Sequence, residues 1–137
     1  MNLNKFLIGS LIGGVVAFML GGLLYAVVFA DMLADLCPGM AAIQSEGNYV
    51  ALVIGNLATG TLLAYIFEKW ASISTWMTGA KAGALIGALM ALSFDSMMHG
   101  TTNLMTWGAV ALDTVISAIL WGGTGAVVGW WLGFKRA

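Results

Sequence analysis

Charged residues are scarce in this sequence. Of its 137 residues only 8% are Asp, Glu, Lys or Arg, whereas soluble domains have about 25%. Five Lys and Arg stand against six Asp and Glu, so no basic surface exists that would neutralise nucleic-acid phosphates. We therefore exclude nucleic acid as a partner. So little charge also excludes disordered chains and coiled coils.

Cysteine and histidine are each present only once, as Cys37 and His99. A single cysteine excludes an intrachain disulfide. A single histidine excludes a His-pair metal site or a bis-His haem within one chain, and no serine lies in a nucleophile-elbow motif. We therefore predict no enzymatic activity, no metal and no cofactor. A cofactor held by His99 alone is a third, less favoured hypothesis.

Apolar residues dominate instead, at 61% of the chain, with a mean hydropathy of +0.96. A bilayer core about 30 Å thick takes about 20 apolar residues in a helix. Four stretches qualify, at about 6–30, 49–67, 79–98 and 107–134. The first is about 25 residues long and far exceeds the 7–15 of a signal peptide. We predict an all-α integral membrane protein with four transmembrane helices, forming one domain over residues 1–137.

The basic residues predict the orientation of these helices. All of them lie at the N-terminus, in the middle loop or at the C-terminus: Lys5, Lys69, Lys81, Lys135 and Arg136. The loops at about 31–48 and 99–106 contain none. Cytoplasmic loops carry the excess of Lys and Arg, so we predict that both termini are cytoplasmic, in a bacterial inner membrane.

Small residues recur every fourth position in each predicted helix. Residues four apart share a helix face, and such stripes let membrane helices pack closely. The predicted packing glycines are Gly13, Gly21, Gly60, Gly83, Gly87, Gly125 and Gly129. They concentrate toward the cytoplasmic half, whereas polar residues on the same stripes concentrate toward the outer half. More small stripes occur than one bundle needs, which favours a homo-oligomer or a place in a larger complex.

The polar residues of these stripes predict an outward-facing pocket. Its predicted lining is Tyr25, Asn56, Asp95, His99 and Asp113, with Thr59, Ser93, Ser96 and Ser117 as further polar partners. The alternative is ordinary hydrogen bonding between helices without any cavity, since such bonds stabilise membrane bundles by about 0.6–2 kcal/mol each.

Asp95 and Asp113 are the predicted ionisable centre of this pocket, because a charged side chain within a span is costly and marks function. Two neighbouring carboxylates resist double ionisation and are suited to sharing a proton. They are equally suited to binding a cation together with the amide oxygen of Asn56. His99 follows Asp95 by one turn and is placed to accept or relay a proton.

The first predicted helix contains the segment Phe18-Met19-Leu20-Gly21-Gly22-Leu23-Leu24-Tyr25, and the third begins Gly79-Ala80-Lys81-Ala82-Gly83. In these segments and in the order of its spans, the chain resembles a family of small prokaryotic four-helix membrane proteins without an established activity. The resemblance implies the same four-helix fold and no catalytic residue.

Two functions fit these patterns. The first is a transporter or channel for a proton, a cation or a small solute, with Asp95 and Asp113 as its centre. The second is a structural or accessory subunit of a larger membrane complex.

Overall fold

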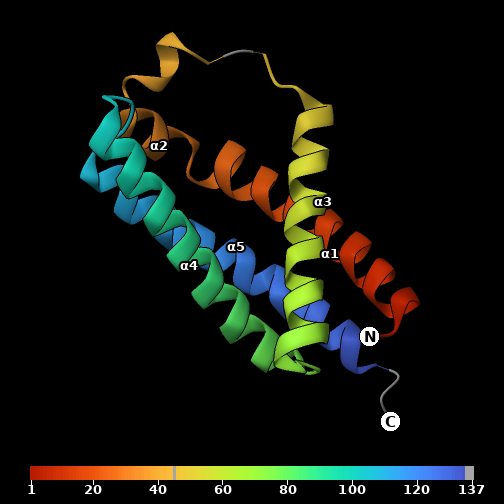
Figure 1. Ribbon diagram of the computed structural model, residues 1–137. Helices are drawn as coiled ribbons and strands as arrows, with labels where there is room; N and C mark the ends of the chain where they lie inside the picture. Colours follow the sequence, from red (N-terminus) through yellow and green to blue (C-terminus); the bar gives the residue numbers. More distant parts are fainter. Residues whose placement is uncertain (45, 135–137) are drawn as a thin grey trace.

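The chain folds into helices throughout the part described by the computed structural model, which covers residues 1–44 and 46–134 (Figure 1). The helices, in chain order, are α1 (Leu3–Leu23) with a π-helical turn η1 (Leu24–Val28), α2 (Ala30–Leu36), a 3₁₀ turn η2 (Met40–Ala42), α3 (Tyr49–Tyr65) with a π-helical turn η3 (Ile66–Ala71), α4 (Trp76–Thr101) and α5 (Trp107–Gly133).

Four helical segments are long and apolar enough to cross a membrane: Leu3–Val28, Tyr49–Ala71, Trp76–Thr101 and Trp107–Gly133. The prediction of an all-α protein with four such helices is confirmed, and each bound differs from the predicted one by four residues or fewer. This is the architecture of a small multi-pass membrane protein. Lys135 and Arg136, used above to predict orientation, lie outside the described residues.

Each of the four spans begins at a capped N-terminus. The side chains of Asn2, Asn48, Thr75 and Thr106 accept hydrogen bonds from the backbone N–H three residues ahead. These caps satisfy donors that the first helical turn leaves without a partner. The start of every span is thus determined by one polar side chain immediately before an apolar run.

We call the end of the bundle that carries Leu3 and Gly133 the inner end, and the opposite end the outer end. Helices α4 and α5 pack backbone to backbone along their inner halves. A Cβ added at Gly79 would meet the carbonyl oxygen of Gly125, and one added at Gly83 would meet that of Trp121. At Gly87 it would meet the Trp121 side chain and, at 2.6 Å, the Ser117 carbonyl oxygen. Only glycine permits this approach, so the sequence stripe on α4 determines how closely the two helices pack.

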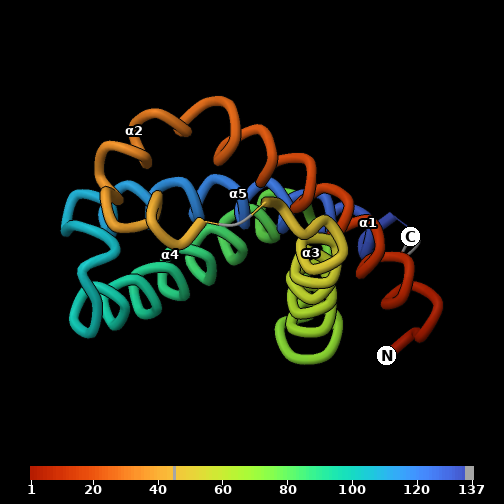
Figure 2. Tube along the Cα trace, turned by 90° about the horizontal axis from the view of Figure 1, so that it is seen from above, coloured from red at the N-terminus to blue at the C-terminus, as the bar shows by residue number. Residues whose placement is uncertain are grey.

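Helices α1 and α3 cross at one point and then separate. At that point a Cβ on Gly60 would meet the backbone of Gly13 and Gly14. Beyond it α3 leans away from α4 and α5, so that the outer ends stand far apart in both views (Figures 1 and 2). The segment after α2 arches across this gap to reach α3. The molecule is therefore closed at its inner end and splayed at its outer end.

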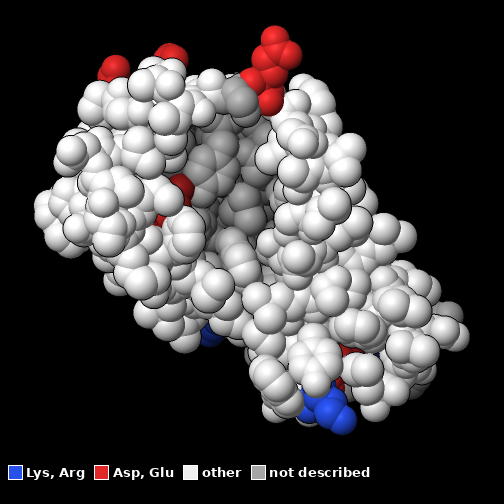
Figure 3. All heavy atoms as spheres, turned by 45° about the horizontal axis from the view of Figure 1, so that its top comes forward, with Lys and Arg blue, Asp and Glu red and all other residues white. Residues whose placement is uncertain are grey.

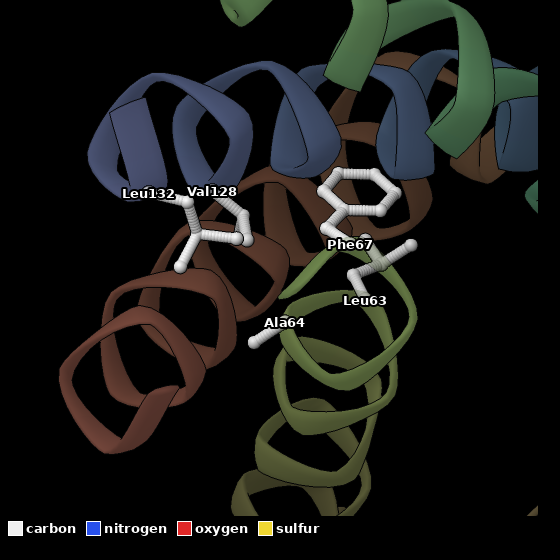
Figure 4. Packing of buried hydrophobic residues seen from close by; sticks show 5 residues of the cluster. All are labelled: Leu63, Ala64, Phe67, Val128 and Leu132. Atoms are coloured by element: carbon white, nitrogen blue, oxygen red, sulfur yellow. The ribbon is translucent and has the colours of Figure 1, made fainter. Parts of the chain in front are cut away.

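The inner end is closed by a fully buried apolar cluster, which we call the inner plug. It consists of Leu63, Ala64, Phe67, Val128 and Leu132, all 0% exposed. Figure 4 shows these side chains filling the space where the end of α3 meets α5 beside α1. The plug therefore fills the inner end of the bundle with apolar side chains.

The contact at Gly83 yields a stability prediction. Gly83→Ala forces α4 and α5 apart, and overpacking of this kind lowers the free energy of unfolding by about 1–3 kcal/mol. Gly55→Ala is the matched control, because nothing lies within 4 Å of a Cβ added at Gly55. We expect Gly83→Ala to lower the midpoint of thermal unfolding in mild detergent, while Gly55→Ala leaves it unchanged or raises it. Equal midpoints for the two variants would contradict the packing described here.

Candidate functional site

Four polar side chains meet in the outer half of the bundle, and we call them the acidic cluster: Tyr25, Asp95, Asp113 and Ser117. The Tyr25 hydroxyl donates to Asp113 Oδ1 at 2.6 Å and lies 3.2 Å from Ser117 Oγ. Ser117 Oγ also donates to Asp113 Oδ2 at 3.5 Å. Asp95 lies on the facing helix α4, at the same depth as Asp113 and within one helical turn of the position opposite it. Asp113 is therefore the centre of the cluster.

The register of α4 against α5 explains why the two carboxyl groups meet. Gly83 faces Trp121 and Gly87 faces Ser117. Continued outward, this antiparallel register places Asp113 opposite Ala91, one helical turn from Asp95. Asp95 lies six residues before the end of α4 and Asp113 six residues after the start of α5. Both lie about 9 Å below the outer ends of their helices.

Tyr25 reaches the cluster from the π-helical turn η1. This turn interrupts span 1 at Leu24–Val28, where its wider geometry changes which side chains face α5. Single π-helical turns occur frequently at functional sites. The sequence carries no signal for this turn, because Leu24 to Val28 is an ordinary apolar run.

A cover lies over the outer side of the cluster. Helix α2 folds back so that Leu36 and Cys37 pack on the buried residues Met105, Ala109 and Val110. The Leu36 carbonyl accepts hydrogen bonds from both the backbone N–H and the hydroxyl of Thr106, at 3.2 and 2.9 Å. The sequence predicted only a loop without basic residues at about 31–48 and not this cover, although Leu33 and Leu36 have helical spacing.

A hollow opens beside the covered cluster, between α3 and the rest of the outer half. Figure 3 shows it beneath the outer loop, with acidic atoms in its wall as well as on the rim. Asp95 is only 8% exposed, whereas Asp113 and Tyr25 retain contact with the surface. The acidic cluster is thus buried on the α4 side and reachable on the η1 side.

The other predicted lining residues are not joined to the cluster by any hydrogen bond in the described part of the chain. The Asn56 amide donates to Leu52 O at 2.8 Å, and its oxygen lies beside Gly21 on α1. His99 Nδ1 lies 2.8 Å from Met105 O and its ring packs on Trp107 at 4.5 Å. Thr59 bonds back to Gly55 O. Of the serines and threonines predicted as further polar partners, Ser117 is the one with a hydrogen bond to the acidic cluster in the described part of the chain.

The described residues contain no group of three or more His, Cys, Asp and Glu side chains that would hold a metal ion. What the cluster offers is a pair of carboxyl groups, one of them oriented by two hydroxyl groups. Such a pair can bind and release a proton, or accept a single cation through its oxygens.

Comparison of the chain with protein-family models, curated proteins and solved structures gave no match. The function must therefore be argued from the geometry of the site.

The pKa of the thiol of Cys37, in the cover, depends on the charge of the acidic cluster. Burial raises the pKa of its thiol above the ordinary value, and the carboxylates of Asp113 and Asp95 raise this pKa further. A nearby negative charge disfavours the thiolate, so removing it lowers the thiol pKa and increases the thiolate fraction at a given pH. We expect the double variant Asp95→Asn/Asp113→Asn, which removes both carboxyl groups, to speed alkylation of Cys37 at pH 8 by about two-fold or more.

The control for this experiment is Asp35→Asn. Asp35 is exposed on α2, two residues before Cys37, and does not contribute to the shift of the thiol pKa. Its substitution is expected to leave the alkylation rate unchanged. A rate equal in wild type and in the double variant across the pH range would show that Cys37 does not sense the cluster.

Proposed function

We propose that this protein transports a proton, a small cation or a small solute across the membrane, with the acidic cluster as its binding site. The observation that carries the proposal is the pair Asp95 and Asp113 at equal depth on facing helices. Charged side chains within spans are costly, and where they occur they mark ion pathways and proton relays.

The contrast between the two halves of the bundle supports transport by alternating access. The cluster borders the outer hollow, while the inner plug and the glycine contacts close the other side. Release to the inner side requires the α1–α3 pair to move against the α4–α5 pair. Leu63 and Phe67 would then separate from Val128 and Leu132, which makes the inner plug the gate.

The test is flux into proteoliposomes, measured with a pH dye and with Na⁺ and K⁺ indicators. Asp113→Asn and Asp95→Asn are expected to slow the wild-type flux by about ten-fold or more, since bonds to charged groups are worth about 1.5–3 kcal/mol. Asp35→Asn, exposed on α2, should transport like the wild type. Absence of flux in folded wild-type protein for every ion, at several pH values, would contradict the proposal for ions.

The second candidate function is an accessory subunit of a membrane complex. A groove of about 240 Å³ between α1 and α3 supports it, lined by Leu11, Gly14, Val15, Phe18, Met19, Val53 and Leu57. Such an apolar groove is shaped for a lipid chain or an apolar helix. A larger complex or homo-oligomer that survives in nanodiscs, together with absent flux, would favour this function.

We further propose that the protein lies in a bacterial inner membrane with both termini in the cytoplasm. The ends of spans 1 and 4 lie side by side, since Lys5 Nζ donates to Leu132 O and Trp131 Nε1 donates to Lys5 O, both at 3.3 Å. On the face shown in Figure 3, basic atoms gather at the end opposite the outer loop. This segregation agrees with the excess of basic residues on cytoplasmic sides.

Cysteine accessibility tests this topology. In a Cys37→Ala background, Gln44→Cys adds a thiol in the exposed outer loop and Lys69→Cys adds one near the inner end of span 2. A membrane-impermeant maleimide should label Gln44→Cys in intact spheroplasts and Lys69→Cys only after lysis. The reverse pattern would place the termini outside.

A further inference from the structure

The oxygen Oδ2 of Asp95 is buried and has no hydrogen-bond partner among the described residues. The residue itself is 8% exposed. A buried carboxylate without a donor carries the full cost of losing its hydration. Oδ2 of Asp95 is therefore the atom of the cluster at which an added proton or cation would relieve the largest desolvation cost.

No described element packed around Asp95 supplies a compensating positive charge. Tyr25 faces it from η1, Cys37 from the end of α2 and Asp113 from α5; His99 lies one turn away on α4, with Nδ1 engaged by Met105 O. None of these is a fixed positive charge. The nearest described basic residue on its own helix, Lys81, lies 14 residues away, about 21 Å along the axis.

The hydroxyl hydrogens of the cluster are directed at Asp113 rather than at Asp95. Tyr25 donates to Oδ1 of Asp113 and Ser117 donates to Oδ2. Both oxygens of Asp113 therefore accept a hydroxyl hydrogen, and no hydroxyl group of the cluster remains to donate to Asp95. Asp95 receives no such bond and is the member of the pair that is suited to carry a hydrogen of its own.

We infer that the occupant of the acidic cluster is a single proton, held on Asp95 and donated in a hydrogen bond to the carboxylate of Asp113. Tyr25 and Ser117 are the positioning residues that hold Asp113 as the acceptor. This inference rests on the proposed function, because it names the ion that the transport site would carry: a proton.

A metal cation fits the same groups poorly. Ca²⁺ takes six to eight oxygen ligands and Mg²⁺ takes six, and the Asn56 amide oxygen that would have added one lies beside Gly21. The Tyr25 hydroxyl points its hydrogen at Asp113, so it would have to turn before its oxygen could bind a cation. A proton needs only the two carboxyl groups.

The test uses an apolar carbodiimide on the full chain in lipid vesicles, with the modified residue mapped by mass spectrometry. The reagent takes the carboxyl proton on its nitrogen and bonds the carboxyl oxygen to its carbon, so it reports a protonated carboxyl in an apolar place. We expect the yield of the Asp95 adduct to fall by about ten-fold or more as the pH rises, because the shared proton is then lost. Na⁺ and K⁺ at equal ionic strength should leave it unchanged.

Asp113→Asn is the informative variant. Its amide can donate directly to Asp95, so the proton is no longer required there. We expect labelling at neutral pH to fall by about ten-fold. Asp35→Asn, at an exposed position of α2, should label at Asp95 like the wild type. Thermal unfolding of each variant shows whether it is folded before labelling is compared.

Two results would overturn the inference. One is a folded protein with no adduct at Asp95 at any pH, and the other is protection of Asp95 by Na⁺ or K⁺, which would identify a cation site. The experiment measures occupancy and not flux. Labelling without proton flux would therefore overturn transport alone, while flux without labelling would overturn the proton assignment alone.

Discussion

The close approach of α4 and α5 is the constraint on which the rest of the structure depends. Gly79 and Gly83 on α4 lie against the carbonyl groups of Gly125 and Trp121 on α5. No side chain fits between the two helices along this length. The polar residues of the same stripes can therefore occur only where the glycines stop, beyond Gly87, and Asp95 and Asp113 are found there. Tight packing in one half and a polar site in the other follow from a single repeat.

The electrostatic character of the site follows from where the positive charges are. The described lysines Lys5, Lys69 and Lys81 belong to the inner end, whereas Asp31, Asp35, Asp95 and Asp113 belong to the outer half. No described basic side chain is available to neutralise a carboxylate in the bundle. A carboxylate there must be balanced by hydroxyl groups or by an ion. The hydroxyl groups bond to Asp113, so only an ion can balance Asp95.

The four spans could be predicted from the sequence because length and hydropathy alone determine them. The four-residue repeat also indicated all four members of the acidic cluster, Tyr25, Asp95, Asp113 and Ser117. Spacing defines the face of a helix but not the angle at which helices cross. Helix α3 leans away beyond Gly60, so Asn56 faces α1 at Gly21. His99 lies on the predicted face of α4, but the Met105 carbonyl engages its ring.

Other parts of the site had no local signal at all. The π-helical turn that carries Tyr25 depends on how span 1 meets α5, which is distant in sequence. The cover depends on a contact between Leu36 and Thr106, 70 residues apart. Features of this kind arise from tertiary packing, and a pattern read along one helix does not contain them.

The single hydroxyl group of Thr106 both accepts and donates a structural hydrogen bond. Its oxygen caps the first turn of α5 by accepting from the Ala109 N–H at 3.3 Å, while its hydrogen is donated to Leu36 O at 2.9 Å. A displacement of α2 would break the second bond and free the hydroxyl to rotate, which weakens the first. The residue that holds the outer cover and the N-cap of the helix that bears Asp113 are therefore the same, so a displaced cover would also weaken the first turn of α5.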